Sequence, residues 1–239
     1  MPIRKGAVMG KLTLYHGSGK IINKPVYGVG NVYNDYGQGF YCTQVLELAK
    51  EWACTEEMDG YANKYVLNTD GLSILDMSNG DYNILNWLAI LLENRTFKIG
   101  GDIAIAAKEY LQKNFRVVYE KYDIIKGYRA DDSYFSFATA FINNSLSLAS
   151  LEKAMYLGEL GEQIVLKSRR AFEQIEFEGH MPAKKEIYYP KKLARDTKAR
   201  EAYKQEKTSI DIVNDVFIMD IIREGWKNDD NRIQRILFK

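Results

Sequence analysis

Short β-type segments are interspersed with helical segments over the first 190 residues, and this mixture restricts the chain to an α+β fold. Apolar and β-branched runs bounded by glycine or polar turns predict strands at 12–16, 40–43, 64–68, 72–76, 162–168, 174–178 and 186–189. Asp70-Gly71 is expected to form the turn between two of these strands. Apolar residues at helical spacing predict helices at 44–55, 82–95, 103–114, 150–157 and from Asp131 or Asp132 through 146.

The pattern changes from Lys191 onward, where we expect a charged helix over 191–207 and an amphipathic helix over 208–225. We therefore predict a mixed body at 1–190 and a helical C-terminal extension at 191–239. Residues 184–207 hold nine Lys/Arg and four Asp/Glu, an excess of five positive charges. This segment either contacts nucleic-acid phosphates or is a solvated helix face, and the helix after it either packs on the body or binds a partner.

Composition excludes several classes of protein. The chain has 33 basic and 32 acidic side chains, so net charge gives no reason to expect a nucleic-acid or acidic-membrane partner. Two histidines and two cysteines argue against a multi-ligand metal site or a disulfide framework, and we expect no metal. No apolar run is long enough to span a membrane, and the basic N-terminus lacks the apolar run of a signal peptide, so we expect a cytoplasmic protein.

Few residues remain that could perform chemistry. His16 ends a predicted strand and precedes Gly17-Ser18-Gly19, where backbone could approach a ligand closely; alternatively, it is a histidine satisfied by hydrogen bonds at a strand end. Tyr41 follows the glycine-rich segment 34–39 and either offers an aromatic face to a flat ligand, with its hydroxyl fixing orientation, or packs in the core. Phosphate-loop, HExxH and GxSxG motifs do not occur, which disfavours kinase and hydrolase activities.

Two motifs, Tyr15-His16-Gly17-Ser18 and then Gly39-Phe40-Tyr41-Cys42-Thr43, resemble the opening motifs of ADP-ribosyltransferases of the histidine–tyrosine–glutamate branch, which contains diphtheria toxin and poly(ADP-ribose) polymerases. The stretches at 16–18, 35–41, 122–127 and 130–132 resemble more narrowly an uncharacterised bacterial family to which this fold is ascribed. The resemblance covers roughly 11–180 and implies split antiparallel β-sheets with an inserted helical segment.

The resemblance also implies roles toward NAD. His16 would donate or accept a hydrogen bond with a ribose hydroxyl. The backbone of Gly17, with Ser18 beside it, would hold the nicotinamide carboxamide. Tyr41 would stack on the nicotinamide ring. Trp52 falls where the family often has a second aromatic on the following helix. Arg129 is a candidate for a pyrophosphate contact.

The third motif departs from the family. The strand at 163–168 opens with Gln163 where the transferases have a glutamate that stabilises the oxocarbenium-like transition state. An amide can make the hydrogen bond but carries no charge, a loss of about 3 kcal/mol. Glu162, the neighbouring carboxylate, is expected on the opposite strand face. The alternative to a catalytic role for Gln163 is that it is a surface strand residue. Asp131-Asp132 invites an acid–base or metal-binding interpretation, although helix capping explains one aspartate.

The leading hypothesis is thus an NAD-dependent ADP-ribosyltransferase, toxin-like and acting on a protein or nucleic acid, with a histidine–tyrosine–glutamine site made of Gln163, Tyr41 and His16. The alternative is a catalytically inactive module with an NAD-binding fold. Because toxin-like transferases are often accompanied by a cognate inhibitor protein, such an inhibitor is a further candidate partner.

Overall fold

The computed structural model describes residues 10–97, 99–130, 132–156, 161–208, 211 and 213–237 and forms two compact units. The first, here called the β unit, consists of Met1–Asn79, Val118–Arg129 and Leu160–Ala194. The second, the helical unit, consists of Gly80–Val117, Ala130–Glu159 and Arg195–Lys239. The helical unit is therefore encoded by two insertions in the β unit and by the C-terminal segment. The expected domain boundary near residue 190 stays a prediction.

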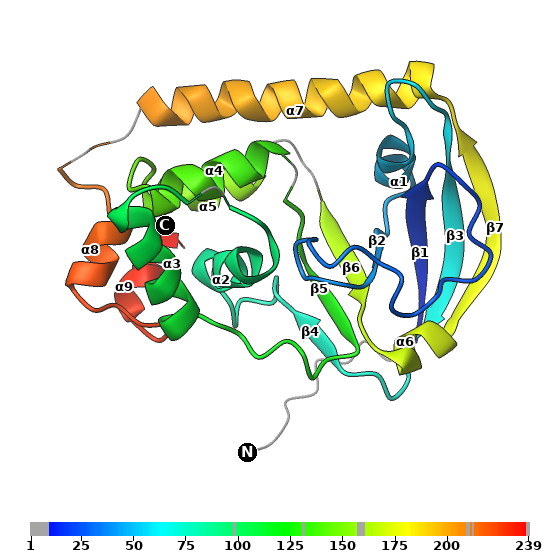
Figure 1. The fold of residues 1–239 in the computed structure, drawn as a ribbon, viewed down its shortest axis with the longest axis horizontal. Coiled ribbons are helices and arrows are strands. Elements are labelled where there is room, and N and C mark those ends of the chain that lie inside the picture. The colour runs from blue at the N-terminus through cyan, green and yellow to red at the C-terminus, as the bar shows by residue number, and fades with distance from the viewer. Residues whose placement is uncertain are drawn as a thin grey trace. The chain divides into compact units, whose positions relative to one another are not determined.

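One sheet of the β unit is antiparallel and contains β1 (Lys11–Ser18), β3 (Gly60–Asn68) and β7 (Ile175–Ala183), with β3 in the middle (Figure 1). His16 lies opposite Asn63 in the β1–β3 ladder. β1 is an edge strand of this sheet, so half of its backbone groups are left for other partners.

The other sheet of the β unit has the order β2-β6-β5-β4. Its strands are β2 (Phe40–Cys42), β6 (Glu162–Leu166), β5 (Ile124–Tyr128) and β4 (Ile74–Asp76). β4 and β5 pair in parallel, and the other ladders are antiparallel. A two-bond bridge joins the sheets, because Tyr15 N–H donates to Thr43 O at 2.8 Å and Thr43 N–H donates to Tyr15 O at 2.9 Å.

Apolar side chains from both sheets form one shared core in the β unit. Its fully or almost fully buried members come from β1, β2, β3, β5 and β6, and they include Leu14, Cys42, Leu67, Ile124, Ile164 and Leu166. The short helix α6 (Arg169–Glu173) adds Ala171 to this core and begins at Ser168, whose hydroxyl accepts the Ala171 N–H.

Helix α1 (Leu46–Ala53) packs unusually closely against β1 and β3. A Cβ added at Gly17 would lie 2.0 Å from the Ala49 carbonyl oxygen, and one added at Gly60 would lie 2.2 Å from the Ala53 carbonyl oxygen. Both positions therefore require glycine, since any side chain would collide with helix backbone.

The helical unit is organised around α2 (Ile84–Asn94), whose residues 84–92 are all buried. A helix that is apolar on every side belongs in the middle of its unit. The surrounding helices are α3 (Asp102–Asn114), α4 (Asp132–Ile142), α5 (Leu148–Tyr156), α8 (Ile218–Arg223) and α9 (Asn231–Leu237), together with the part of α7 (Lys185–Thr208) from Arg195 onward.

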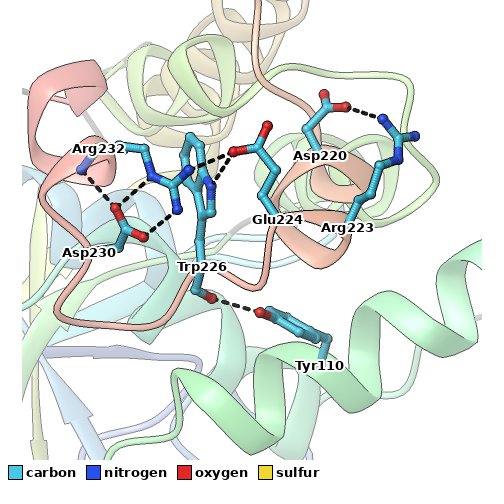
Figure 2. A network of polar contacts seen from close by, with 7 residues as sticks. All are labelled: Tyr110, Asp220, Arg223, Glu224, Trp226, Asp230 and Arg232. Carbon is cyan, nitrogen blue, oxygen red and sulfur yellow. Dashed lines mark hydrogen bonds and ion pairs between the residues drawn. The ribbon is translucent and has the colours of Figure 1, made fainter.

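A polar network around Trp226 fixes the end of the chain to α3 (Figure 2). The indole N–H donates to Glu224 at 2.9 Å, the Arg232 guanidinium lies 4.4 Å from the ring centroid, and the Trp226 carbonyl accepts the Tyr110 hydroxyl at 2.8 Å. Hydrogen bonds from Arg232 lower the pKa of Asp230 to about 2. Trp226 is buried, so its ring anchors the loop between α8 and α9.

The α+β class is confirmed, and so are the expected strands at 12–16, 40–43, 64–68, 72–76, 162–168 and 174–178. The Asp70-Gly71 turn exists, but β3 and β4 on either side of it belong to different sheets and do not form a hairpin. The chain needs this turn to cross from one sheet to the other.

Three element predictions were wrong. Residues 186–189 are helical, because the Asp59 carboxylate accepts the Lys185 N–H at 2.9 Å and caps the start of α7. α4 ends at Ile142, short of 146, because Asn144 adopts a φ of 59° that no helix continues through. Of the described residues in the expected 208–225 helix, only 218–223 form a new helix, since Asp211 accepts the N–H groups of Val213 and Asn214 and makes a turn.

None of the helices in the described part of the chain combines the length and hydropathy needed to cross a membrane.

Gly17→Ala should lower the free energy of unfolding by about 1–3 kcal/mol, because the methyl group would displace the α1 backbone. Gly19→Ala is the matched control: a Cβ there meets nothing within 4 Å, so its effect should stay within about 0.5 kcal/mol. Urea denaturation measures both. Equal stability of the two variants would contradict the close packing of α1 on β1.

Candidate functional site

His16 is a neutral side chain with one ring nitrogen committed to the protein. Its Nδ1 lies 2.7 Å from the Tyr41 carbonyl oxygen, which only accepts, so Nδ1 carries the proton. The ring stacks on Phe40 with centroids 4.3 Å apart. Burial lowers the pKa of His16, outweighing the hydrogen bond to Tyr41, which acts in the other direction. In the neutral tautomer Nε2 is therefore a hydrogen-bond acceptor, suited to a ligand hydroxyl.

Gly17 presents backbone groups at the edge of β1. Tyr15 directs its N–H and C=O to the outer edge of β1, where they form the bridge to Thr43. Backbone groups of successive strand residues point to opposite edges in turn, so the N–H and C=O of Gly17, two residues later, point to the same edge as those of Tyr15. The absent side chain of Gly17 faces α1, so the glycine serves packing while its amide remains at the edge. Ser18 has a local role, since its hydroxyl donates to Lys20 O at 2.5 Å and accepts from Asn63 Nδ2 at 3.1 Å.

Tyr41 is half-buried on β2, and its hydroxyl holds the loop before the strand. It donates to Gly37 O at 2.6 Å and accepts the Tyr36 N–H at 3.0 Å. The sequence predicted that this hydroxyl would orient a ligand, but in the structure it forms hydrogen bonds within the protein. What Tyr41 can offer a ligand is consequently its ring.

Lys167 fastens the same loop from the end of β6. Its Nζ donates to the carbonyl oxygens of Tyr36 and Gln38, both at 2.5 Å. Burial lowers the pKa of Lys167 to about 8, with Glu120 acting weakly in the opposite direction. The loop that carries Tyr36 is thus tied to the protein at several backbone groups.

Gln163 is buried at 3% exposure on the central strand β6, so the alternative of a surface strand residue is wrong. Its Nε2 donates to Asp35 Oδ2 and to the Tyr128 carbonyl oxygen, both at 2.9 Å. Both amide hydrogens are used, and no described residue donates to Oε1. Gln163 can therefore act toward a ligand only as an acceptor.

Glu162 lies on the other strand face, as expected from strand alternation. Its carboxylate pairs with Lys126 Nζ at 3.1 Å and is 40% exposed. It does not share the surroundings of Gln163.

Tyr36 links Gln163 to Tyr41. The Tyr36 side chain is completely buried, and its hydroxyl donates to the same Tyr128 carbonyl that accepts from Gln163, at 3.0 Å. A Cβ at Gly127 would lie 2.2 Å from that hydroxyl, so the glycine in β5 makes room for Tyr36.

Trp52 and Arg129 form a pair beside these residues. The Arg129 guanidinium lies 4.5 Å from the centroid of the Trp52 ring, and the Trp52 Cβ is one of the atoms closest to Gly17. Trp52 Nε1 is buried, and no described residue accepts its hydrogen bond. Trp52 thus joins the group through its contacts with Gly17 and Arg129.

The structure accordingly gathers the predicted residues of the β unit into one contact network: His16, Gly17, Ser18, Tyr41, Trp52, Arg129 and Gln163. Asp131 and the side chain of Asp132 lie outside the described residues. The second histidine, His180, is exposed on β7 and contacts Tyr61. Among described residues no group of three metal-ligating side chains occurs.

Sequence reasoning missed three functional candidates, Asp35, Tyr36 and Lys167. Asp35 and Tyr36 stand in the stretch that carries the family resemblance, and this was the one signal that could have pointed to them. Lys167 comes shortly after Gln163 in the chain, but nothing in its local sequence indicates that it turns back to the loop at 36–38.

A family model described as "Protein of unknown function (DUF3990)" matches residues 12–177. The chain belongs to this family. The DUF3990 match contains all seven residues gathered at the candidate site. No curated protein and no solved structure matched the chain.

The depressed pKa of Lys167 predicts a pH dependence of stability. From about pH 8 the folded protein releases this proton, while the unfolded chain keeps it to about pH 10.4. Because the unfolded state then binds more protons, the free energy of unfolding should rise with pH in this window. The difference between wild type and Lys167→Met, measured by denaturation from about pH 7.5 to about pH 10, should grow in favour of wild type. A difference independent of pH would contradict the burial of this ammonium group.

Proposed function

We propose that the protein is an NAD-dependent ADP-ribosyltransferase whose acceptor is a protein or a nucleic acid. The observation that carries the proposal is the orientation of Gln163, whose saturated amide nitrogen leaves its carbonyl oxygen as the acceptor in the network of His16 and Tyr41. An acceptor at this position suits a ribose hydroxyl of NAD. The ADP-ribosyltransferase-like fold is part of the proposal.

The remaining residues support the same ligand. Neutral His16 has Nε2 for a second ribose hydroxyl, and the Gly17 amide and carbonyl at the strand edge match the donor and acceptor of a carboxamide. The half-buried Tyr41 ring, held by its own hydroxyl, is a rigid surface for nicotinamide. Arg129, stacked on Trp52, supplies a positive charge for phosphate.

In the proposed reaction, the bond between the nicotinamide nitrogen and the anomeric carbon of ribose breaks, and its electron pair leaves with nicotinamide. The acceptor's nucleophile forms a new bond to that carbon and loses its proton to water. The chain's contribution is to bind and orient NAD and to hold Gln163 Oε1 toward the ribose as positive charge develops.

Nicotinamide release is the direct test. Full-length protein incubated with NAD and cell lysate should release nicotinamide and leave ADP-ribose on a macromolecule. His16→Ala should reduce turnover by about a hundredfold. His180→Ala is the matched control, because the second histidine is exposed on β7 and should leave turnover unchanged.

NAD binding without nicotinamide release would favour the alternative, a non-catalytic binding module. If neither binding nor release occurred while denaturation showed an intact fold, the proposal would be overturned. An inhibitor protein as partner stays a prediction.

Acidic pH should weaken NAD binding, because protonation of His16 removes the Nε2 acceptor. Since burial lowers the pKa of His16 below its ordinary value of about 6.5, affinity should be constant down to at least that pH. It should then fall by up to about tenfold per pH unit once the pH drops below the lowered pKa. Calorimetry from about pH 8 to about pH 4.5 measures this, with His180→Ala expected to give the same profile. An affinity that increases on acidification would contradict a ligand hydroxyl on Nε2.

A further inference from the structure

Asp35 is a buried acidic residue that the proposed reaction has not used. It precedes β2, is 5% exposed, and accepts a hydrogen bond from Gln163 Nε2 at 2.9 Å. We propose that Asp35 is a positioning residue that fixes the Gln163 amide and places a negative charge behind it. This inference rests on the proposed function and concerns the same site.

The geometry permits only one orientation of the amide. Nε2 faces two oxygens, the Asp35 carboxylate and the Tyr128 carbonyl, and both are acceptors when the carboxylate is ionised. A flipped amide would direct Oε1 at those oxygens and lose both hydrogen bonds. The pair therefore determines which end of Gln163 a ligand meets.

Asp35 also changes the electronic character of that end. A hydrogen bond from an amide to a carboxylate is charge-assisted, and it polarises the amide so that more electron density resides on the carbonyl oxygen. As positive charge develops on ribose, Oε1 then carries more negative charge than the amide alone would. Asp35 in this way supplies, through Gln163, part of the charge that a glutamate would supply directly.

The pairing has an unexpected consequence for the family's glutamate. In Gln163→Glu a second carboxylate would face Asp35 and the Tyr128 carbonyl, so both amide hydrogen bonds would be lost and the two carboxylates would either repel each other or have to take up a proton. Introducing the usual transferase residue should therefore impair this protein. Combining it with Asp35→Asn should restore the pair with its polarity reversed, because the new side-chain amide can donate to the new carboxylate.

The test compares wild type with D35N, Q163E and D35N/Q163E in the full-length protein, with D70N as the matched control in an exposed turn. At saturating NAD, D35N should lower kcat for nicotinamide release roughly tenfold, less than the roughly hundredfold typical of losing a direct contact. The calorimetric Kd for NAD should be unchanged, since the amide oxygen introduced by D35N still accepts the Gln163 N–H. Q163E should lose more activity than D35N, and D35N/Q163E should recover above Q163E.

A purely structural role for Asp35 predicts wild-type kcat in D35N, because the hydrogen bond survives. That result, or Q163E more active than wild type, overturns the proposal for Asp35 and leaves the proposed function standing. Wild type without nicotinamide release overturns the proposed function instead. In that event the melting temperatures of the same variants test the Asp35–Gln163 pairing. Q163E should have the lowest melting temperature, and D35N/Q163E should melt at a higher temperature than Q163E. Additive effects of the two substitutions on the melting temperature would overturn the pairing.

Discussion

The carbonyl oxygen of Tyr128 accepts hydrogen bonds from both the Tyr36 hydroxyl and the Gln163 amide, and the candidate site depends on this one acceptor. The two donors come from the loop before β2 and from β6, so the carbonyl at the end of β5 joins three segments far apart in sequence. Tyr36 in turn donates its N–H to the Tyr41 hydroxyl, and Lys167 holds the Tyr36 and Gln38 carbonyls. A glycine-rich loop, which costs much entropy to order, is thereby fixed next to the Tyr41 ring, the proposed contact for nicotinamide.

Glycine at this site is required by packing rather than by direct approach of a ligand. Gly17 admits the Ala49 carbonyl of α1, and Gly127 admits the Tyr36 hydroxyl. The consequence for function is indirect. Close packing of α1 positions Trp52 next to β1, while the Gly17 amide stays at the strand edge. Gly17 can therefore serve both packing and ligand binding, because its Cβ position faces α1 while its backbone N–H and C=O point to the edge of β1.

Local pattern was sufficient for β1, β2 and β6, which are apolar runs next to glycine, and for α1, whose apolar residues recur at helical spacing. It was insufficient for β5, a five-residue strand in which Lys126 and Gly127 interrupt the apolar run. It was misleading at Tyr188 and Tyr189, whose β-propensity is overridden when Asp59, a residue far away in sequence, caps α7. The Asp35–Gln163 contact joins residues separated by 128 positions, and no single-sequence pattern encodes it.

Replacing glutamate by glutamine does not by itself remove negative charge from a site of this kind. If a carboxylate behind an amide lies about twice as far from the reacting carbon, it keeps about half of the Coulomb attraction, because the energy falls only as the inverse of distance. Asp35 is buried, so water screens it little. The amide between the charges is aligned by two hydrogen bonds, so its dipole adds to the field instead of averaging out. The relevant chemical unit for the proposed reaction is therefore the Asp35–Gln163 pair, and a motif that compares only the third position with glutamate would misjudge the charge available to that reaction.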